Sequence, residues 1–356
     1  MTEEKNTLRR FSIGTNAVPG TAVWYLTDLA ESKGRQELFT RQAPQRLKAL
    51  REHALVESAV SSNRIEGVQI DASRVATVVF GRPVLRDRDE EEVRGYRDAL
   101  ALIHERGATE LLLTEETVLQ LHRMARGEIW DAGLYKDRDG DIIEKYPAGR
   151  ERLRFRTVAA AATPAAMADL VASWDECLRE RWVHPLVALA AFNLDFLCVH
   201  PFRDGNGRVS RLLLLLQCYQ LGFEVGRYIS LERLIEENKD RYYETLEQSS
   251  QGWHEGSHDP WPYIHFVLFV LKSAYREFER LVGEVATPKG AKTERVHEAV
   301  RAFQGDFTLG DLERACPEVS RDMVRRVLRD LKAASEVECL GKGPGARWRR
   351  GGTTLE

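Results

Sequence analysis

The stretch HPFRDGNGRVSR spans residues 200–211 and contains one histidine, one acid, three arginines and two glycines around an asparagine. Largely apolar runs precede it at 194–199 and follow it at 212–216. Polar groups buried between such runs cost free energy unless they have partners. A polar, glycine-rich loop in this position therefore indicates a binding or catalytic site.

The composition of this loop predicts an anion site at the start of a helix. Pro201 and the glycines interrupt any helix passing through, and a helix that is apolar nearly all round should begin near Arg208. A Gly-Asn-Gly turn at 205–207 presents free backbone N–H groups and the positive end of the helix dipole. Arg208 and Arg211 lie one turn apart, so we expect both to face the same anion.

Two further residues of the loop suit chemistry on a phosphate. Asp204 could hold Mg²⁺, which prefers one or two carboxylates together with phosphate oxygens. His200 could accept a proton from a nucleophile. The alternative is a structural turn with a capping histidine, but the number of polar and glycine positions at fixed spacing favours transfer chemistry on a nucleotide.

The stretch resembles, at every defined position, the Fic signature HxFx(D/E)GNGRxxR, and a wider resemblance covers roughly residues 20 to 275. Fic proteins are helical enzymes that transfer AMP, less often another phosphate-containing group, onto hydroxyls of target proteins. The resemblance implies ATP as substrate, His200 as general base, Phe202 as the anchor of the loop, and Asp204 as the ligand of Mg²⁺ or Mn²⁺. It assigns the α- and β-phosphates to the 205–207 backbone and the Asn206 side chain. The implied nucleotide-binding residues are Arg203, Asp204, Gly205, Asn206, Gly207, Arg208, Arg211, Tyr242 and Tyr243.

A second motif precedes this region. Alone, Glu66 would be a solvated carboxylate at a helix end, followed by Gly67 as the C-terminal glycine. The pattern Ser62-x-x-x-Glu66-Gly67 resembles the Fic inhibitory motif (S/T)xxxE(G/N). The resemblance implies that Glu66 pairs with Arg211 and blocks the γ-phosphate position. A bidentate carboxylate–guanidinium contact would compete strongly with phosphate.

A β-hairpin is predicted where the helical pattern breaks, because residues 141–146 and 151–158 flank a turn-like stretch at 147–150. In Fic proteins a hairpin here is the flap that covers the active site, and it can pair with an extended segment of the target. Lys136 departs from the arginine that many relatives have at that position.

The C-terminal region reads as a separate module after a linker at 283–292. A helix should start after Thr308 and another after Ser320, with a basic hairpin at 337–350. The second helix has one face of apolar residues and an opposite face of arginines, Arg321, Arg325 and Arg329. This order resembles a winged helix-turn-helix, which leaves DNA binding and protein binding as alternatives.

The composition of the 356-residue chain, 43% hydrophobic and 30% charged with a formal net charge of −3, is typical of a soluble globular protein. It favours neither a membrane protein nor a global nucleic-acid binder, and Met1–Arg10 is too polar for a signal peptide. Five scattered cysteines without a Cys-x-x-Cys pair predict a cytoplasmic location and no zinc site. Residues 1–20 look like a loose arm.

Together these features predict an all-α Fic core with a small hairpin flap and a C-terminal winged-helix domain. The expected regions are an N-terminal helical region at 1–110, a catalytic core at 111–284 and the winged-helix domain at 285–356. The predicted reaction is self-inhibited AMP transfer to Ser, Thr or Tyr hydroxyls of an unidentified target protein and of the protein itself. Removal of AMP by the same site and a DNA-binding regulator with a nucleotide-sensing core are the alternatives. DNA binding and a homodimer stay open.

Overall fold

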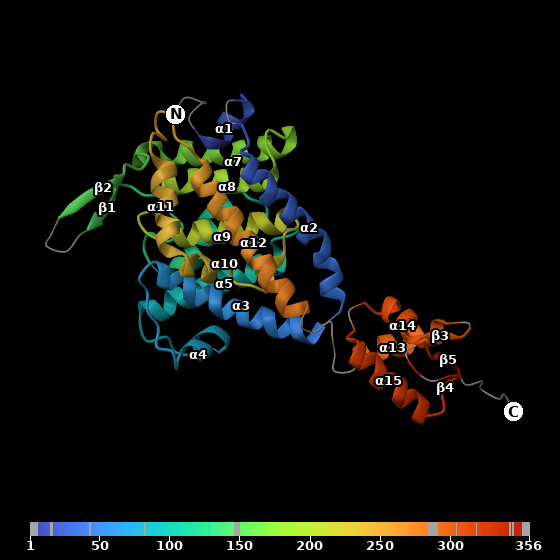
Figure 1. Ribbon diagram of the computed structural model, residues 1–356. Helices are drawn as coiled ribbons and strands as arrows, with labels where there is room; N and C mark the ends of the chain where they lie inside the picture. The colour runs from blue at the N-terminus through green and yellow to red at the C-terminus, as the bar shows by residue number, and fades with distance from the viewer. Residues whose placement is uncertain are drawn as a thin grey trace. The chain divides into compact units, whose positions relative to one another are not determined.

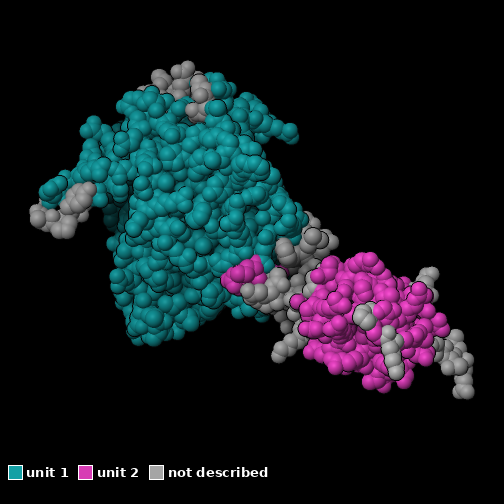
Figure 2. Space-filling model, viewed as in Figure 1, with its two compact units in different colours: residues 1–279 teal, residues 280–356 magenta. Residues whose placement is uncertain are grey.

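The computed structural model describes residues 6–14, 17–42, 44–81, 83–127, 129–145, 150–283, 291–303, 305–317, 319–341, 343 and 345–350. The chain divides into two compact units, Met1–Glu279 and Arg280–Glu356 (Figure 2). The first unit thus takes in both the predicted N-terminal region and the predicted core. Most of the predicted linker, residues 284–290, lies outside the described residues.

The first unit is built from helices and one antiparallel hairpin (Figure 1), as predicted. Its helices are α1 (Thr7–Ser12), α2 (Gly20–Gln42), α3 (Pro44–Ile65), α4 (Val75–Phe80), α5 (Arg88–Arg106), α6 (Glu115–Arg126), α7 (Thr163–Glu180), α8 (Pro185–Val199), α9 (Asn206–Gln220), α10 (Leu231–Glu237), α11 (Lys239–Ser250) and α12 (Trp261–Gly283). Two short 3₁₀ turns are η2 (Ala160–Ala162) and η3 (Val225–Arg227), and the hairpin strands are β1 (Ile142–Lys145) and β2 (Glu151–Phe155).

Helices α8 and α9 form the centre of this unit. Nearly every side chain of both is buried. Helix α8 is apolar nearly all round, whereas α9 buries polar residues in addition to its leucines: Asn206, Arg208, Ser210, Arg211 and Gln217. Helix α9 contacts α3, α5, α6 and α8. It begins at Asn206, two residues before the predicted start. The signature loop therefore joins two central helices, whose packing holds both of its ends.

Local capping chemistry sets two helix ends of this unit. The Thr114 side chain caps α6 by accepting a hydrogen bond from the Thr117 N–H. Helix α3 ends at Ile65, and Gly67 has a φ of +88°, the left-handed conformation that favours glycine after a helix. This end places the predicted inhibitory residue Glu66 just beyond the last turn of α3.

The prediction of a loose arm at residues 1–20 is wrong over its described part. Helix α1 buries Leu8 and Phe11 against the unit and contacts α7 and α8. Its Thr7 N–H and hydroxyl both donate to one carboxylate oxygen of the buried Asp195, at 3.0 and 2.5 Å. Burial raises the pKa of Asp195 to about 6. The arm was misread because six residues show almost no periodicity and their anchoring carboxylate lies far along the chain.

The second unit contains α13 (Ala291–Ala302), α14 (Leu309–Ala315) and α15 (Arg321–Ala333), with strands β3 (Phe307–Thr308), β4 (Val337–Cys339) and β5 (Arg347–Arg350). The strands form an antiparallel sheet in the order β3-β5-β4. Thr308 caps α14 through a capping box, whereas the Ser320 side chain makes no capping bond to α15. The predicted helices and hairpin are thus present, and the apolar face of α15 forms part of the unit's core. Among the described residues of both units, no helix has the length and apolarity needed to cross a membrane.

Candidate active site

His200 ends helix α8 and has a φ of +52°, a left-handed conformation that is unusual for a residue with a side chain. Its ring Nδ1 lies 3.3 Å from the carbonyl oxygen of Leu197. When Nδ1–H donates to this carbonyl, Nε2 keeps its lone pair and can accept a proton. Burial, assisted by the nearby charge of Lys136, lowers the pKa of His200 to about 4. The imidazole is therefore neutral at pH 7, as a general base must be.

The loop after His200 is fastened from within. The Phe202 ring is buried and stacks on His122, with 3.7 Å between ring centroids. The Asn206 side chain accepts from the Phe202 N–H at 2.9 Å and donates to the Phe202 carbonyl at 2.8 Å. Phe202 thus anchors the loop as predicted. The Asn206 side chain, predicted to bind phosphate, is instead buried and committed to closing the loop.

The N-terminus of α9 has the geometry of an anion site. Gly205 precedes the helix with a φ of +85°, and no side chain caps the first turn. A Cβ on Gly207 would lie 2.1 Å from Oε1 of Glu66. The Glu66 carboxylate therefore occupies space directly over Gly207, where backbone N–H groups and the helix dipole attract negative charge.

Glu66 contacts Arg211, the pairing that the resemblance implied, and Ser62 contacts the same guanidinium. Nη2 of Arg211 donates to Glu66 Oε1 at 2.8 Å and to the Ser62 carbonyl at 2.9 Å, while Nε donates to the Ser62 hydroxyl at 2.8 Å. The Glu66 contact is a single hydrogen bond, not the bidentate pair that was predicted, because Ser62 takes the Nε edge. Within the part of the chain that the structure describes, the buried Nη1 of Arg211 has no hydrogen-bond partner of normal geometry.

Arg208 does not face the same space as Arg211, contrary to the prediction. Its side chain is 1% exposed and donates to Glu92 at 2.6 Å and to Asn63 at 3.3 Å. Although the two arginines lie one turn apart, they have different carboxylate partners: Glu92 of α5 pairs with Arg208, and Glu66, just beyond the end of α3, pairs with Arg211. Arg208 is thus a buried residue that links the start of α9 to α5 and α3.

Asp204 lies beside this buried cluster, with its side chain 54% exposed. Arg126 bridges two carboxylates, with Nη1 at 2.7 Å from Glu92 and at 2.8 Å from Asp204. Burial raises the pKa of Asp204, but the guanidiniums of Arg126 and Arg208 outweigh it and hold this pKa below its usual range. Asp204 is therefore an ionised, partly open carboxylate.

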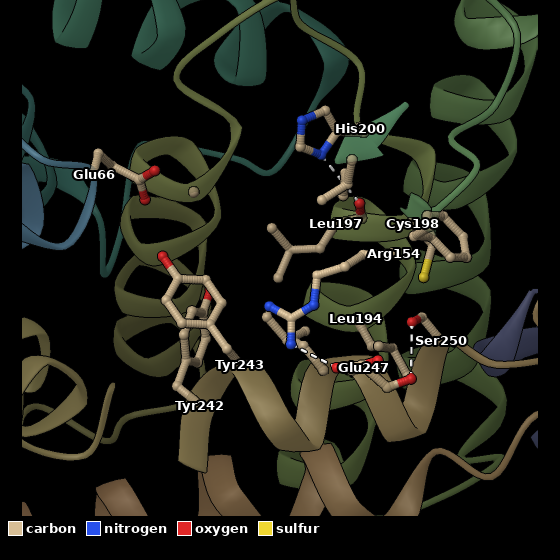
Figure 3. A pocket seen from close by; sticks show the side chains of 14 residues that line it. Glu66, Arg154, Leu194, Leu197, Cys198, His200, Tyr242, Tyr243, Glu247 and Ser250 are labelled. Atoms are coloured by element: carbon tan, nitrogen blue, oxygen red, sulfur yellow. Dashed lines mark hydrogen bonds and ion pairs between the residues drawn. The ribbon is translucent and has the colours of Figure 1, made fainter. Parts of the chain in front are cut away.

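One pocket of about 230 Å³ is lined by three of these groups, Glu66, His200 and Gly207 (Figure 3). Its lining combines groups from the signature, the inhibitory motif, the hairpin and α11; the residues are Glu66, Ile142, Arg154, Phe155, Leu194, Leu197, Cys198, His200, Gly207, Tyr242, Tyr243, Leu246, Glu247 and Ser250. Tyr242 and Tyr243 line it as the resemblance implied. The other predicted nucleotide-binding residues are not part of this lining; they are Arg203, Asp204, Gly205, Asn206, Arg208 and Arg211. Arg203 pairs with Asp137 at 3.3 Å and lies over the Trp130 ring.

Several site residues escaped the sequence analysis. Arg154 on β2 projects into the pocket and pairs with Glu247 of α11 at 2.5 Å (Figure 3), which fastens the hairpin over the cavity. Glu92 and Arg126 hold Asp204 and Arg208. From sequence alone, charged residues are expected to be solvated. Their pairing could not be predicted, because the partners lie far apart along the chain and no local sequence pattern links them.

The donors present fit a hard divalent cation only in part. Among the described residues, no three or more His, Cys, Asp or Glu side chains gather where they could hold a metal ion. Asp204 offers an ionised and partly exposed carboxylate. One carboxylate suits Mg²⁺ when substrate phosphates and water complete the shell.

The structure is that of a mostly helical protein in which a histidine and the N-terminus of α9 line one pocket. Residues 112–218 match the model of the Fic/DOC family, so the chain contains a Fic domain. The chain is 26% identical over 214 residues to a "Protein adenylyltransferase Fic" of Nematostella vectensis, covering 58% of this chain and 44% of that protein. A protein of the same name from Drosophila willistoni is 21% identical over 234 residues, covering 64% and 42%. The chain thus spans less than half the length of these relatives.

Solved structures show the same fold. A crystal structure of a Fic family protein from Desulfovibrio desulfuricans G20 superposes with a TM-score of 0.59 at 24% identity, covering 96% of this chain and 99% of that one. Residues 134–508 of Fic-1 from C. elegans give a TM-score of 0.57 at 19% identity, covering 75% and 74%.

Proposed function

We propose that this protein transfers AMP from ATP to Ser, Thr or Tyr hydroxyls of proteins, itself included, and that Glu66 restrains the reaction. The observation that carries the proposal is the pocket that His200 and Gly207 both line, with the Glu66 carboxylate over the helix N-terminus. The transfer needs a neutral base and a site for phosphate. The restraint needs an anion that occupies the phosphate site and can leave it. The name of the two relatives, protein adenylyltransferase, agrees with it.

The chemistry follows from the groups in place. Nε2 of His200 takes the proton of the target hydroxyl, whose oxygen attacks the α-phosphorus of ATP while the bond to pyrophosphate breaks. The free N–H groups at the start of α9 stabilise negative charge on the phosphates. Asp204 would hold Mg²⁺ or Mn²⁺, which neutralises phosphate charge when bound. Arg211 binds the β/γ end once Glu66 has left it.

Intact-mass spectrometry tests this proposal. Wild-type protein and Glu66→Gly are incubated with ATP and Mg²⁺, alone and with cell extract. The expected result is one or more added AMP groups, and more of them on the variant. If neither protein modifies itself or any protein in the extract, the transfer activity is refuted.

Removal of AMP is the second candidate, because the carboxylate of Glu66 lines the same pocket and is 28% exposed. There it could position a water molecule to attack the phosphorus of the attached AMP, which breaks the bond to the target oxygen and releases AMP and the free hydroxyl. Adenylylated substrate protein separates the two reactions. Loss of AMP with wild type but not with Glu66→Gly would favour removal.

Replacing Asp204 with alanine is expected to lower the transfer rate by about 10²-fold or more, because the phosphates lose the carboxylate that holds their cation. The rate of label transfer from ATP is measured across a range of Mg²⁺ concentrations. Asp175→Ala removes an exposed carboxylate of α7 outside the pocket and serves as the control. Equal rates in excess chelator and in Mg²⁺ for the wild type would contradict this role of Asp204.

We also propose that the C-terminal unit contacts DNA. Residues 280–356 contain fifteen Lys and Arg against twelve Asp and Glu. A groove beside α15 is lined by Arg321, Arg325, Arg329 and Trp348, among others. Guanidiniums along an exposed helix face suit backbone phosphates. A protein-binding winged helix is the alternative, and cytoplasmic location and homodimer formation stay predictions.

The full chain should bind duplex DNA at low salt, and affinity should fall steeply as salt rises, because phosphate contacts release counterions. Arg325→Ala should weaken binding across sequences and reduce the salt slope by about one. Arg314→Ala, which removes an 80% exposed arginine on α14, is the matched control. Fluorescence anisotropy measures the affinity for DNA and its dependence on salt. No binding at low salt would favour the protein-binding alternative.

A further inference from the structure

We propose that Lys136 is the positioning residue that holds His200 in its base geometry and ties it to the hairpin. The inference rests on the proposed function, in which His200 is the base. Lys136 lies in the loop between α6 and β1, 64 positions from His200, and its side chain is 5% exposed. No motif of the sequence links the two residues.

Lys136 binds the backbone on both sides of His200. Its N–H donates to the Pro201 carbonyl at 2.8 Å, and its Nζ donates to the Val199 carbonyl at 3.2 Å. The residue held between these two carbonyls has the left-handed φ of +52°. Such a conformation persists only where the surroundings determine it. The two contacts contribute to that determination, because they hold the peptide group just before His200 and the one just after Pro201.

The same ammonium reaches the base of the hairpin. Nζ donates to the Thr157 hydroxyl at 2.9 Å, and that hydroxyl donates to the Gly140 carbonyl at 2.5 Å. Gly140 and Thr157 lie just before β1 and just after β2. Lys136 therefore connects the closed base of the hairpin to the loop that carries His200. A target segment that moves the hairpin would move the base through this connection.

The charge of Lys136 acts on the imidazole as well. Burial and the Lys136 ammonium both oppose protonation of His200, whereas the carboxylates of Glu66 and Asp204 favour it. Without the ammonium, the carboxylates of Glu66 and Asp204 would be the remaining charges that act on the ring, and the pKa of His200 would rise. A structural lysine that only stabilised the fold would not govern where His200 titrates. The titration therefore separates the two roles.

The test follows His200 in the full chain by NMR of ¹³Cε1-labelled histidine, with the signal of His200 identified from its loss in His200→Ala. Lys136→Met keeps the length of the side chain and removes its charge and donors. It is expected to raise the pKa of His200 by about 0.5–1 unit, since a like charge has been removed. Lys136→Arg should return the pKa to within about 0.3 unit of wild type, because it restores charge and donors. Lys272→Met removes the ammonium that pairs with Asp28, outside the pocket, and should not shift it.

Transfer rates in the Glu66→Gly background give the second readout. Lys136→Met should lower kcat about 10- to 100-fold, because a misplaced base loses its alignment, with little change in KM for ATP. Lys136→Arg should recover most of the rate. A His200 titration unmoved in Lys136→Met overturns the proposal, and so does a rise in KM without a fall in kcat. If Glu66→Gly itself transfers nothing, the proposed function fails while the NMR titration still decides the role of Lys136.

Discussion

Replacing His200 with alanine is expected to lower the rate of AMP transfer by about 10²- to 10⁴-fold, the usual loss when a general base is removed. Binding of ATP should change little, because the imidazole acts on the hydroxyl of the target and the phosphates are held by α9 and Arg211. Both effects are measured in the Glu66→Gly background. Label incorporation gives the transfer rate, and calorimetry gives the affinity for ATP. His53→Ala, which removes a 71% exposed imidazole on α3, is the control.

The pH profile adds a sharper form of the same prediction. Burial lowers the pKa of His200 to about 4, so the base is deprotonated above that pH and becomes protonated below it. The rate should therefore fall as pH drops through about 4, and should not show an acid limb near 6.5. Undiminished self-modification by His200→Ala would exclude His200 as the base.

Glu66→Gly is expected to raise AMP transfer by at least about tenfold. A hydrogen bond between charged groups contributes about 1.5–3 kcal/mol, and each 1.4 kcal/mol is a tenfold change in an equilibrium. Because Glu66 and Arg211 share a single Nη2–Oε1 hydrogen bond, we expect their contribution to lie at the lower end of this energy range. Displacement from the space over Gly207 adds to the gain, because the carboxylate and a phosphate cannot both lie there. Incorporation of label from α-labelled ATP measures the change.

Paired variants separate charge from shape. Glu66→Gln keeps the side chain over Gly207 and removes only the charge. The rate of AMP transfer should therefore rise less in Glu66→Gln than in Glu66→Gly. Glu236→Gln disrupts a comparable pair, with Arg64 at 3.0 Å, outside the pocket, and should not activate. Arg211→Ala should not activate either, since it removes the ligand of the phosphate together with the inhibitory contact. Equal incorporation by wild type and Glu66→Gly would contradict the restraint.

The sequence by itself determined the identity of the domain and the central elements of the site. The glycines at 205 and 207, the histidine before them and the apolar runs on either side predict a loop between two buried helices. Local chemistry suffices for this prediction, because helix breaking, capping and hydrophobic periodicity act between near neighbours. The pairing of Glu66 with Arg211 came from the resemblance of two motifs to a family.

Only the tertiary structure decided which partner each charged side chain has. Arg208 and Arg211 belong to the same turn of α9, yet Arg208 pairs with Glu92 and Arg211 with Glu66. Asn206 closes its own loop, and Lys136 reaches the carbonyl of Val199. A buried charge needs a partner, but the physics of burial does not specify from which helix the partner comes. That choice depends on how the helices pack, which local sequence does not encode.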